Sequence, residues 1–401
     1  MKSKMTRCFK SAAAVLIAAA LLASCAVQTP AGEERPEEKL TTVSFPLSAP
    51  VPEDNQEEFS EWIIPAKDMG EPQGNVWIEG KALSGGYFSV GGENYVPLEG
   101  TLESLGVAFE KEDGDIRFSF GGGEISVDHA LGGLYRDKSL LGSVFRDRER
   151  GVMVPLSLFT EGGGYVFTAM ENDLCFSKTV KSDEIPKGIK VPVLMYHAVS
   201  DDTWGIKELF VKPAEMEKQL KYLTEHGYTT VTFEDLPELE TIKKPVMLTF
   251  DDGYRDNYEE LFPLLEKYGC KATVFMIAGK EGKTHYLTAD MIREMSDSGL
   301  VSIQSHTMTH PKLGETAEAK QREELEAAQK TILSWTHRLP FVLCYPSGSY
   351  NAATRTVGKE YYAFGIKMNG GTWNTSGDPF LVPRLYVSRE TSLSAFAAMI
   401  G

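Results

Sequence analysis

Two groups of chemically capable side chains stand out in the sequence, and each follows an apolar stretch. Asp251 and Asp252 close the apolar part of VMLTFDDGY, and His306 and His310 lie in VSIQSHTMTHPKL. On a helical turn, the i, i+4 spacing of the histidines would place both imidazoles on one face, about 5–6 Å apart. Two histidines and one carboxylate form an open metal site that leaves positions for water and substrate. These residue types therefore indicate metal-assisted chemistry.

The elements that must position these side chains alternate between strands and helices from about residue 190 onward. VPVLMYH, PVMLTF, KATVFMI, VSIQSH and FVLCYP have the pattern of buried strands, and helical patterns lie between most of them. Repeated β/α units over about 210 residues predict a mostly parallel sheet that closes into an irregular (β/α) barrel. Chemistry in such barrels lies at the C-terminal ends of strands. A turn or helix cap would explain the acidic pair alone, but not a histidine pair on the same rim.

TFDDGY and SHTMTH resemble the first and second motifs of the polysaccharide deacetylases, carbohydrate esterase family 4. VPVLMYHAV, KATVFMI and CYPSGSYN resemble the branch that includes deacetylases of poly-N-acetylglucosamine. The resemblance covers residues 191–401 and implies a catalytic domain over 190–401. It implies a hydrolase that removes N-acetyl groups from N-acetylglucosamine-containing polysaccharide and releases acetate.

Carried over position by position, the resemblance assigns a role to each motif residue. Asp252, His306 and His310 would bind the divalent metal, with Zn²⁺ expected and Co²⁺ or Ni²⁺ as alternatives, and Asp251 would be the general base. A metal lowers the pKa of bound water and polarises a carbonyl. The backbone N–H of Ser347 in YPSG would help to hold the oxyanion.

The sequence departs from the wider family at its third, fourth and fifth motifs. Cys344 stands where an Arg is expected, and both the Asp-Trp pair and the Leu-x-His that supplies the general acid are missing. Arg384 is a candidate to neutralise Asp251 from another strand; the alternative is a surface arginine at a strand end. By elimination among seven histidines, His197 is the candidate acid. The alternative is that His197 only orients a metal-binding carboxylate.

Two aromatic residues are candidates for contact with sugar. Tyr345 could line the sugar subsite, and Trp373 could stack on a pyranose face. Large aromatic side chains are more often part of a packed core, so this alternative stays open for both residues.

The first 25 residues read as a leader. Basic residues precede the apolar run AAAVLIAAALLA, which is too short to span a bilayer comfortably, and LASC follows it. LASC resembles the bacterial lipobox, which implies that Cys25 is lipidated and becomes the mature N-terminus. We therefore expect a lipid-anchored protein on the outer face of the bacterial cell membrane. An ordinary secretion signal that contains a Cys is the alternative.

Two further regions precede the catalytic domain. Residues 26–75 are rich in Pro, Glu and Thr and read as a flexible linker. In residues 76–178, YVPL at Tyr95–Leu98 returns as MVPL at Met153–Leu156, and each copy predicts a short helix followed by two strands. This repeat resembles the copper amine oxidase N-terminal-like domain, which implies a smaller N-terminal α+β repeat domain. The polar segment SDEIPKG reads as a linker, so a chain that starts near Lys187 is expected to fold alone.

Charge and cysteine content limit which binding partners and which disulfides we expect. The chain has 41 Lys and Arg against 57 Asp and Glu, a formal net charge of −16, which disfavours nucleic acid. Five cysteines, widely spaced, predict free and mostly buried thiols rather than a disulfide framework. We expect a monomer that binds polysaccharide.

Two rival functions stay open at this stage. One is a catalytically impaired, glycan-binding surface lipoprotein, which would have a broken metal triad. The other is a metal amidohydrolase that acts on a small amide, which would have a deep closed pocket. Peptidoglycan and exopolysaccharide are both possible substrates of the deacetylase.

Overall fold

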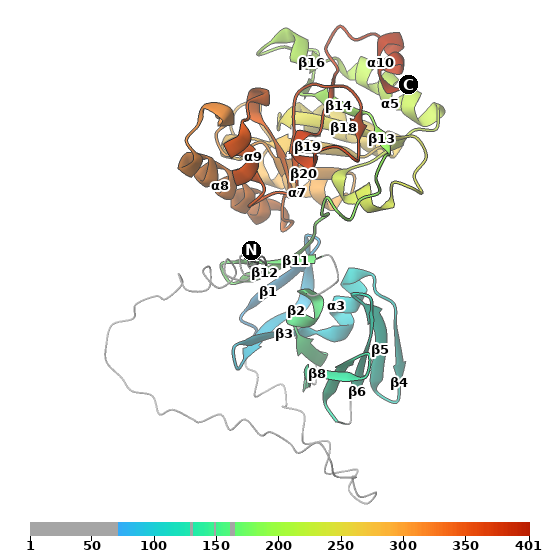
Figure 1. Ribbon diagram of the computed structural model, residues 1–401, viewed down its shortest axis with the longest axis vertical. Coiled ribbons are helices and arrows are strands. Elements are labelled where there is room, and N and C mark those ends of the chain that lie inside the picture. The colour runs from blue at the N-terminus through green and yellow to red at the C-terminus, as the bar shows by residue number, and fades with distance from the viewer. Residues whose placement is uncertain (1–70, 129–130, 148–149, 161–164) are drawn as a thin grey trace, which may run out of the picture. The chain divides into compact units, whose positions relative to one another are not determined.

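The computed structural model describes residues 71–401, apart from residues 129–130, 148–149 and 161–164 (Figure 1). The predicted leader, Cys25 and most of the predicted linker therefore lie outside the described residues. No helix in the described residues is long and apolar enough to cross a membrane. Three cysteines within these residues, Cys175, Cys270 and Cys344, are free and buried, as expected.

Residues 74–178 form a mainly β region that also contains two short helices. A seven-stranded sheet has the order β11-β12-β1-β2-β3-β10-β9, and a five-stranded sheet runs from β4 to β8. The elements are β1 (Gly74–Ile78), β2 (Lys81–Val90), β3 (Glu93–Pro97), α3 (Leu98–Leu105), β4 (Phe109–Glu112), β5 (Asp115–Phe120), β6 (Gly123–Asp128), β7 (Gly133–Arg136), β8 (Ser139–Ser143), β9 (Phe145–Asp147), β10 (Gly151–Pro155), α4 (Ser157–Thr160), β11 (Tyr165–Met170) and β12 (Asp173–Lys178).

The repeat has the predicted local structure in both copies. Helix α3 follows the first Val-Pro-Leu and precedes the β4–β5 hairpin, and α4 follows the second and precedes the β11–β12 hairpin. Gly106 ends α3 in the left-handed conformation, with φ of 68°. The family of this region stays a prediction.

Residues 190–401 form the predicted α/β region. Its main sheet has the order β22-β21-β20-β19-β18-β14-β24, and every pair in it is parallel. The strands are β13 (Lys190–Val191), β14 (Val193–Tyr196), β15 (Ala198–Val199), β16 (Phe210–Val211), β17 (Thr229–Thr230), β18 (Pro245–Asp252), β19 (Ala272–Met276), β20 (Val301–Ser305), β21 (Val342–Cys344), β22 (Phe364–Ile366), β23 (Trp373–Asn374) and β24 (Leu385–Tyr386). The central strands are buried along their length, as expected for parallel strands covered on both faces.

Helices surround these strands (Figure 1). They are α5 (Pro213–Glu225), α6 (Phe262–Tyr268), α7 (Ala289–Asp297), α8 (Glu318–Thr336), α9 (Ala352–Gly358) and α10 (Leu393–Ile400). Local signals set their ends: Pro213 begins α5, the Thr288 side chain caps α7, and Gly269 ends α6 with φ of 61°.

The sheet is curled, and one short segment lies between its two edges. Val382 forms a parallel bridge with Ile366 of β22, while Leu385 and Tyr386 pair with β14. Residue 384 is between these pairings, so its side chain is fixed by backbone contacts on both sides.

The segment that contains the predicted polar linker packs against the α/β region. Val180 and Ile185 are buried and belong to the same hydrophobic cluster as Val191, Phe233 and other residues of the α/β core. The core of this region therefore extends N-terminal to Lys187, which corrects the expectation of a simple linker.

Candidate metal centre and active site

The candidate residues gather where parallel strands end. Asp251 and Asp252 are the last residues of β18, His306 directly follows β20, and His197 directly follows β14. Because the strands are parallel neighbours in one sheet, their C-terminal ends meet at one rim. The prediction that these side chains share a rim is confirmed.

Asp252, His306 and His310 form a group whose candidate ligand atoms lie within 4.8 Å of one another. The Asp252 Oδ1 atom is 3.6 Å from His306 Nε2 and 3.8 Å from His310 Nε2. The expected helical turn is wrong: residues 306–310 form a loop, in which Thr307 and His310 have φ of 67° and 65°. These left-handed residues, and not helical periodicity, bring the rings together, with 4.8 Å between their centroids.

His306 is held in a tautomer that suits a metal ligand. Its Nδ1–H donates to the carbonyl oxygen of Cys344 at 2.8 Å, so Nε2 is the nitrogen that faces Asp252. Burial lowers the pKa of His306, which keeps the imidazole neutral near pH 7. A histidine ligand whose second nitrogen bonds to a backbone carbonyl is a common arrangement in metal sites.

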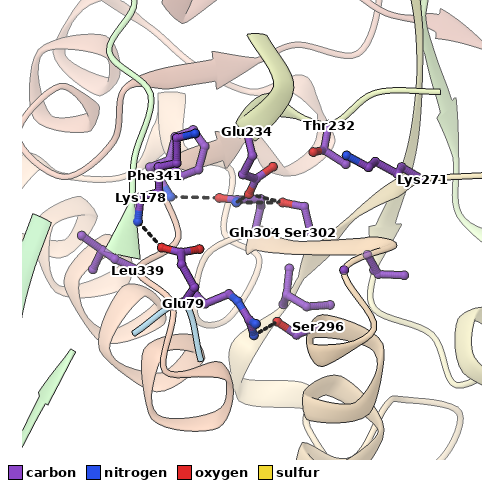
Figure 2. Close-up of a pocket in the computed structure, with 14 residues that line it drawn as sticks. Glu79, Lys178, Thr232, Glu234, Lys271, Ser296, Ser302, Gln304, Leu339 and Phe341 are labelled. Carbon is purple, nitrogen blue, oxygen red and sulfur yellow. Dashed lines mark hydrogen bonds between the residues drawn. The ribbon is translucent and has the colours of Figure 1, made fainter. Parts of the chain in front are cut away.

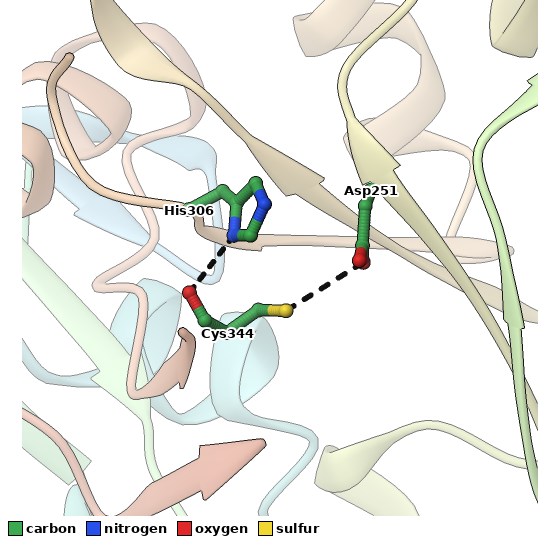
Figure 3. A group of neighbouring side chains, drawn as sticks. All are labelled: Asp251, His306 and Cys344. Atoms are coloured by element: carbon green, nitrogen blue, oxygen red, sulfur yellow. Dashed lines mark hydrogen bonds between the residues drawn. The ribbon is translucent and has the colours of Figure 1, made fainter. Parts of the chain in front are cut away.

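The donor set fits a borderline transition metal such as zinc. Two imidazoles and one carboxylate leave coordination positions open, and His310 is partly exposed, with 32% of its side chain accessible. A second group, Asp251, His306 and Cys344, also clusters (Figure 3). It fits less well, because it is fully buried and burial raises the pKa of the Cys344 thiol well above its usual value.

Arg384 forms a buried, bidentate ion pair with Asp251. Its Nη1 and Nη2 atoms donate to the two carboxylate oxygens at 2.7 Å each. The remaining N–H groups of the guanidinium donate to the Lys367 carbonyl at 3.1 Å, the Thr249 hydroxyl at 3.1 Å and the Cys344 sulfur at 3.2 Å. All five donors of the guanidinium are therefore satisfied. Arg384 is only 1% exposed, so the alternative of a surface arginine is wrong.

This pair sets the charge of Asp251. Burial alone would raise the pKa of the carboxyl group, but the charge and hydrogen bonds of Arg384 outweigh it and hold the pKa well below its usual range. Asp251 is therefore ionised at neutral pH. The Arg384 guanidinium thus lies against Cys344, the residue that stands where the sequence comparison led us to expect an arginine.

His197 lies beside this pair without a hydrogen bond to it. Its Nε2 atom is 3.9 Å from Asp251 Oδ2, and its side chain is 11% exposed. Burial lowers the pKa of His197 from its ordinary value. The position suits both roles left open by the sequence.

The other predicted site residues are Ser347, Tyr345 and Trp373, and they differ in exposure. Ser347 is exposed in the turn after β21, with φ of 53°, and its role as a donor stays a prediction. Tyr345 is fully buried, and its hydroxyl donates to the Phe380 carbonyl at 3.1 Å. Trp373 is 1% exposed and packs near Phe233 and Phe364. The assignment of Tyr345 and Trp373 to sugar contacts is therefore wrong, because both belong to the core.

Sequence reasoning missed two residues of the site. Thr249 faces Arg384 because it lies two positions before Asp251 on the same strand, and period-2 alternation could have found it. Burial and the nearby charge of Asp252 raise the pKa of the Tyr254 phenol. Its place two residues after a metal-binding acid was the only available signal.

A separate cavity of about 220 Å³ lies away from the rim (Figure 2). Its lining includes Glu79, Glu234, Gln304 and Arg338, and it reaches β20 along Val301–Gln304, before the strand end that carries His306. None of the proposed metal ligands lines it. We therefore place the chemistry at the rim and not in this cavity.

A curled parallel sheet with carboxylates and histidines at its C-terminal rim defines an α/β protein with a candidate metal centre. Residues 238–363 match the family model described as polysaccharide deacetylase. YxkH of Bacillus subtilis (strain 168), which is assigned as a polysaccharide deacetylase, is 36% identical over 220 residues, covering 53% of this chain and 77% of YxkH. The chain belongs to the polysaccharide deacetylase family.

Two further similarities extend the comparison. The poly-beta-1,6-N-acetyl-D-glucosamine N-deacetylase of Staphylococcus aureus is 27% identical over 205 residues, covering 46% of this chain and 70% of that protein. Among solved structures, BC0361, a polysaccharide deacetylase from Bacillus cereus, has a TM-score of 0.51 and 28% identity, covering 72% of this chain and 78% of that chain.

Proposed function

We propose that this protein is a metal-dependent deacetylase that hydrolyses N-acetyl groups of N-acetylglucosamine-containing polysaccharide and releases acetate. The observation that carries the proposal is the group Asp252, His306 and His310, with the ionised Asp251 as the adjacent residue. Membership of the polysaccharide deacetylase family supports it, as does the similarity to a poly-beta-1,6-N-acetyl-D-glucosamine N-deacetylase.

The proposed metal ligands are Asp252, His306 and His310, with Zn²⁺ as the proposed metal and Co²⁺ or Ni²⁺ as alternatives. A divalent cation at this site supplies Lewis acidity, which polarises the N-acetyl carbonyl and makes water more acidic. The hydrogen bond from His306 Nδ1–H to the Cys344 carbonyl keeps His306 Nε2 oriented to bind the metal.

The side chains of this protein would then move the protons. Asp251 accepts the proton of the attacking water, and Arg384 holds its carboxylate in one orientation. The backbone N–H of Ser347 donates to the oxygen that becomes negative, as an oxyanion hole does. His197 donates a proton to the departing amine, or else orients the neighbouring carboxylate.

The direct test is acetate release by the purified mature chain. Substrates are purified peptidoglycan, a poly-N-acetylglucosamine exopolysaccharide, N-acetylglucosamine oligomers and a small acetamide, and Asp252→Ala is the inactive control. Release from one of the polymers supports the proposal and identifies the substrate. Release from a small acetamide alone, with none from any glycan, would favour a small-amide hydrolase. No release from any substrate by the metal-loaded protein would favour the glycan-binding lipoprotein.

The cell-surface location is a second part of the proposal. It is supported by the leader and the LASC sequence at Leu22–Cys25, and a surface position would bring a monomeric enzyme to cell-envelope polysaccharide. Cys25→Ala should move the protein from the membrane fraction to the medium or leave it unprocessed. Unchanged processing and membrane retention would count against lipidation.

A further inference from the structure

A ten-residue loop, residues 200–209, extends from the rim next to His197. It joins β15 to β16, two short strands that pair in parallel. The loop contains two large apolar side chains that are not part of the buried core: Ile206 is 66% exposed, and Trp204 is half-buried. Exposed apolar side chains beside a candidate active site are typical of ligand contacts.

The loop is held in place by residues from the C-terminal part of the chain. The Arg389 guanidinium donates to the carbonyls of Ser200 at 3.0 Å, Asp201 at 3.0 Å and Phe210 at 2.7 Å. The Arg389 backbone N–H also donates to the Glu208 carbonyl at 2.9 Å. Both ends of the loop are therefore fixed, so the position of Trp204 is set before any ligand binds.

Trp204 reaches the metal site through one intervening residue. Its ring lies edge-on to Tyr254, with 6.0 Å between centroids and an interplanar angle of 78°. Tyr254 lies two residues after Asp252, the proposed metal-binding carboxylate, in the loop that follows β18.

A third loop, which follows β19, also contacts Trp204. His285 stacks on Trp204, with 4.4 Å between ring centroids and an interplanar angle of 7°. The His285 side chain is exposed, while its carbonyl accepts the Arg255 N–H at 2.8 Å and Tyr286 pairs with Tyr254 as an isolated bridge. The three loops follow β15, β18 and β19 and meet beside the metal site.

We propose that Trp204, Tyr254, His285 and Tyr286, here called the aromatic wall, bind the sugar unit next to the one that is deacetylated. The inference rests on the proposed function and adds a specificity determinant to it. A pyranose ring presents a face of C–H groups to aromatic rings and hydroxyl groups to polar atoms, which the mixture of Tyr, Trp and His can match. Because Trp204 packs on Tyr254, which follows Asp252 in the chain, the inference places a sugar against Trp204 next to the unit whose N-acetyl group reaches the metal site.

The consequence is a preference for oligomers over single sugars. An aromatic wall that contacts the neighbouring sugar unit contributes nothing to the binding of a monomer, but it lowers the KM of a longer oligomer. A purely structural cluster would instead affect all substrates alike, because a displaced loop would disturb the metal site for each of them.

The test compares acetate release from an N-acetylglucosamine pentamer and from the monomer, using the full mature chain. Trp204→Ala and His285→Ala are compared with the conservative Trp204→Phe. His226→Ala is the matched control, because His226 is also exposed and stacks on an aromatic ring, Tyr222 of α5, at 3.8 Å. Binding of the pentamer is measured separately by calorimetry in an Asp251→Asn background, so that the result does not depend on turnover.

We expect Trp204→Ala to raise KM and Kd for the pentamer about tenfold with monomer kinetics unchanged. Trp204→Phe and His226→Ala should stay close to wild type. Equal losses on monomer and pentamer, or unchanged pentamer KM and Kd, would overturn the inference. A wild-type protein that binds the pentamer through Trp204 but releases no acetate would instead overturn the proposed function alone.

Discussion

Arg384 and Asp251 come from distant parts of the α/β region in sequence, yet their side chains form two parallel hydrogen bonds of 2.7 Å inside the protein. Both side chains are at most 4% exposed. A bidentate pair of this kind fixes the orientation of the carboxylate as well as its charge. The position of the proposed base is therefore determined by a residue 133 positions away along the chain.

The first prediction concerns this pair. Arg384→Met should lower the free energy of unfolding by about 3–5 kcal/mol, because it leaves a buried carboxylate without its partner. It should also move the acidic limb of the pH–rate profile to higher pH, because the group that lowers the pKa of Asp251 is gone. Urea unfolding and acetate release measure the two effects. The double variant Asp251→Asn/Arg384→Met should regain stability but not activity, and equal instability in both variants would contradict the argument.

The second prediction concerns the metal. Chelation should abolish acetate release, and Zn²⁺, Co²⁺ or Ni²⁺ should restore it, because Asp252, His306 and His310 form the candidate ligand group. Alanine at any of the three should lower the metal content measured by elemental analysis, while Asp251→Asn should keep metal and lose activity. Normal hydrolysis by Asp251→Asn would show that the base is assigned to the wrong residue.

The third prediction separates the two roles of His197. If His197 is the acid, His197→Gln should lower turnover by about 10²–10⁴-fold and remove one limb of the pH–rate profile. Because burial lowers its pKa, that limb is expected below the ordinary value of 6.5. If His197 only orients a carboxylate, the variant should mainly weaken metal binding. Unchanged activity and metal content would exclude both roles.

The fourth prediction concerns Asp256, which lies behind the rim. Burial raises its pKa to about 7, although Oδ1 accepts the Val199 N–H at 2.8 Å. The stability that the protonated carboxyl provides is fully present below its unfolded pKa of about 3.8 and is lost as pH rises through about 7. Asp256→Asn should therefore stabilise the protein by about 2–4 kcal/mol at pH 8 and by little at pH 4. Urea unfolding at both pH values checks this, with the exposed Asp202→Asn as control. A difference that does not change with pH would contradict it.

The fifth prediction concerns the start of the α/β region. A chain that begins at Thr179 keeps Val180 and Ile185, which are 1% and 4% exposed, and should fold and deacetylate soluble oligomers. A chain that begins at Lys187 loses both buried side chains and should be less stable by about 2–5 kcal/mol. Thermal unfolding of the two chains measures the difference. Equal stability would show that this segment does not belong to the core.

The sequence by itself determined the local features of this protein. Alternating β/α patterns predicted the parallel sheet, because strands buried on both faces read as continuous apolar runs. TFDDGY and SHTMTH identified Asp251, Asp252, His306 and His310, because these residues lie close in sequence to the strand ends that position them.

Only the tertiary structure decided which distant residues act together. Arg384 was one of two open alternatives until the segment between Val382 and Leu385 was placed between the sheet edges. Tyr345 and Trp373 have the composition of sugar contacts, but burial depends on packing across the whole domain and removed both from the site. Conversely, Trp204 and His285 are 81 positions apart and stack only because the loops that follow β15 and β19 come together in the fold. Strand order and packing are long-range properties, so neither spacing nor residue type could supply these pairings.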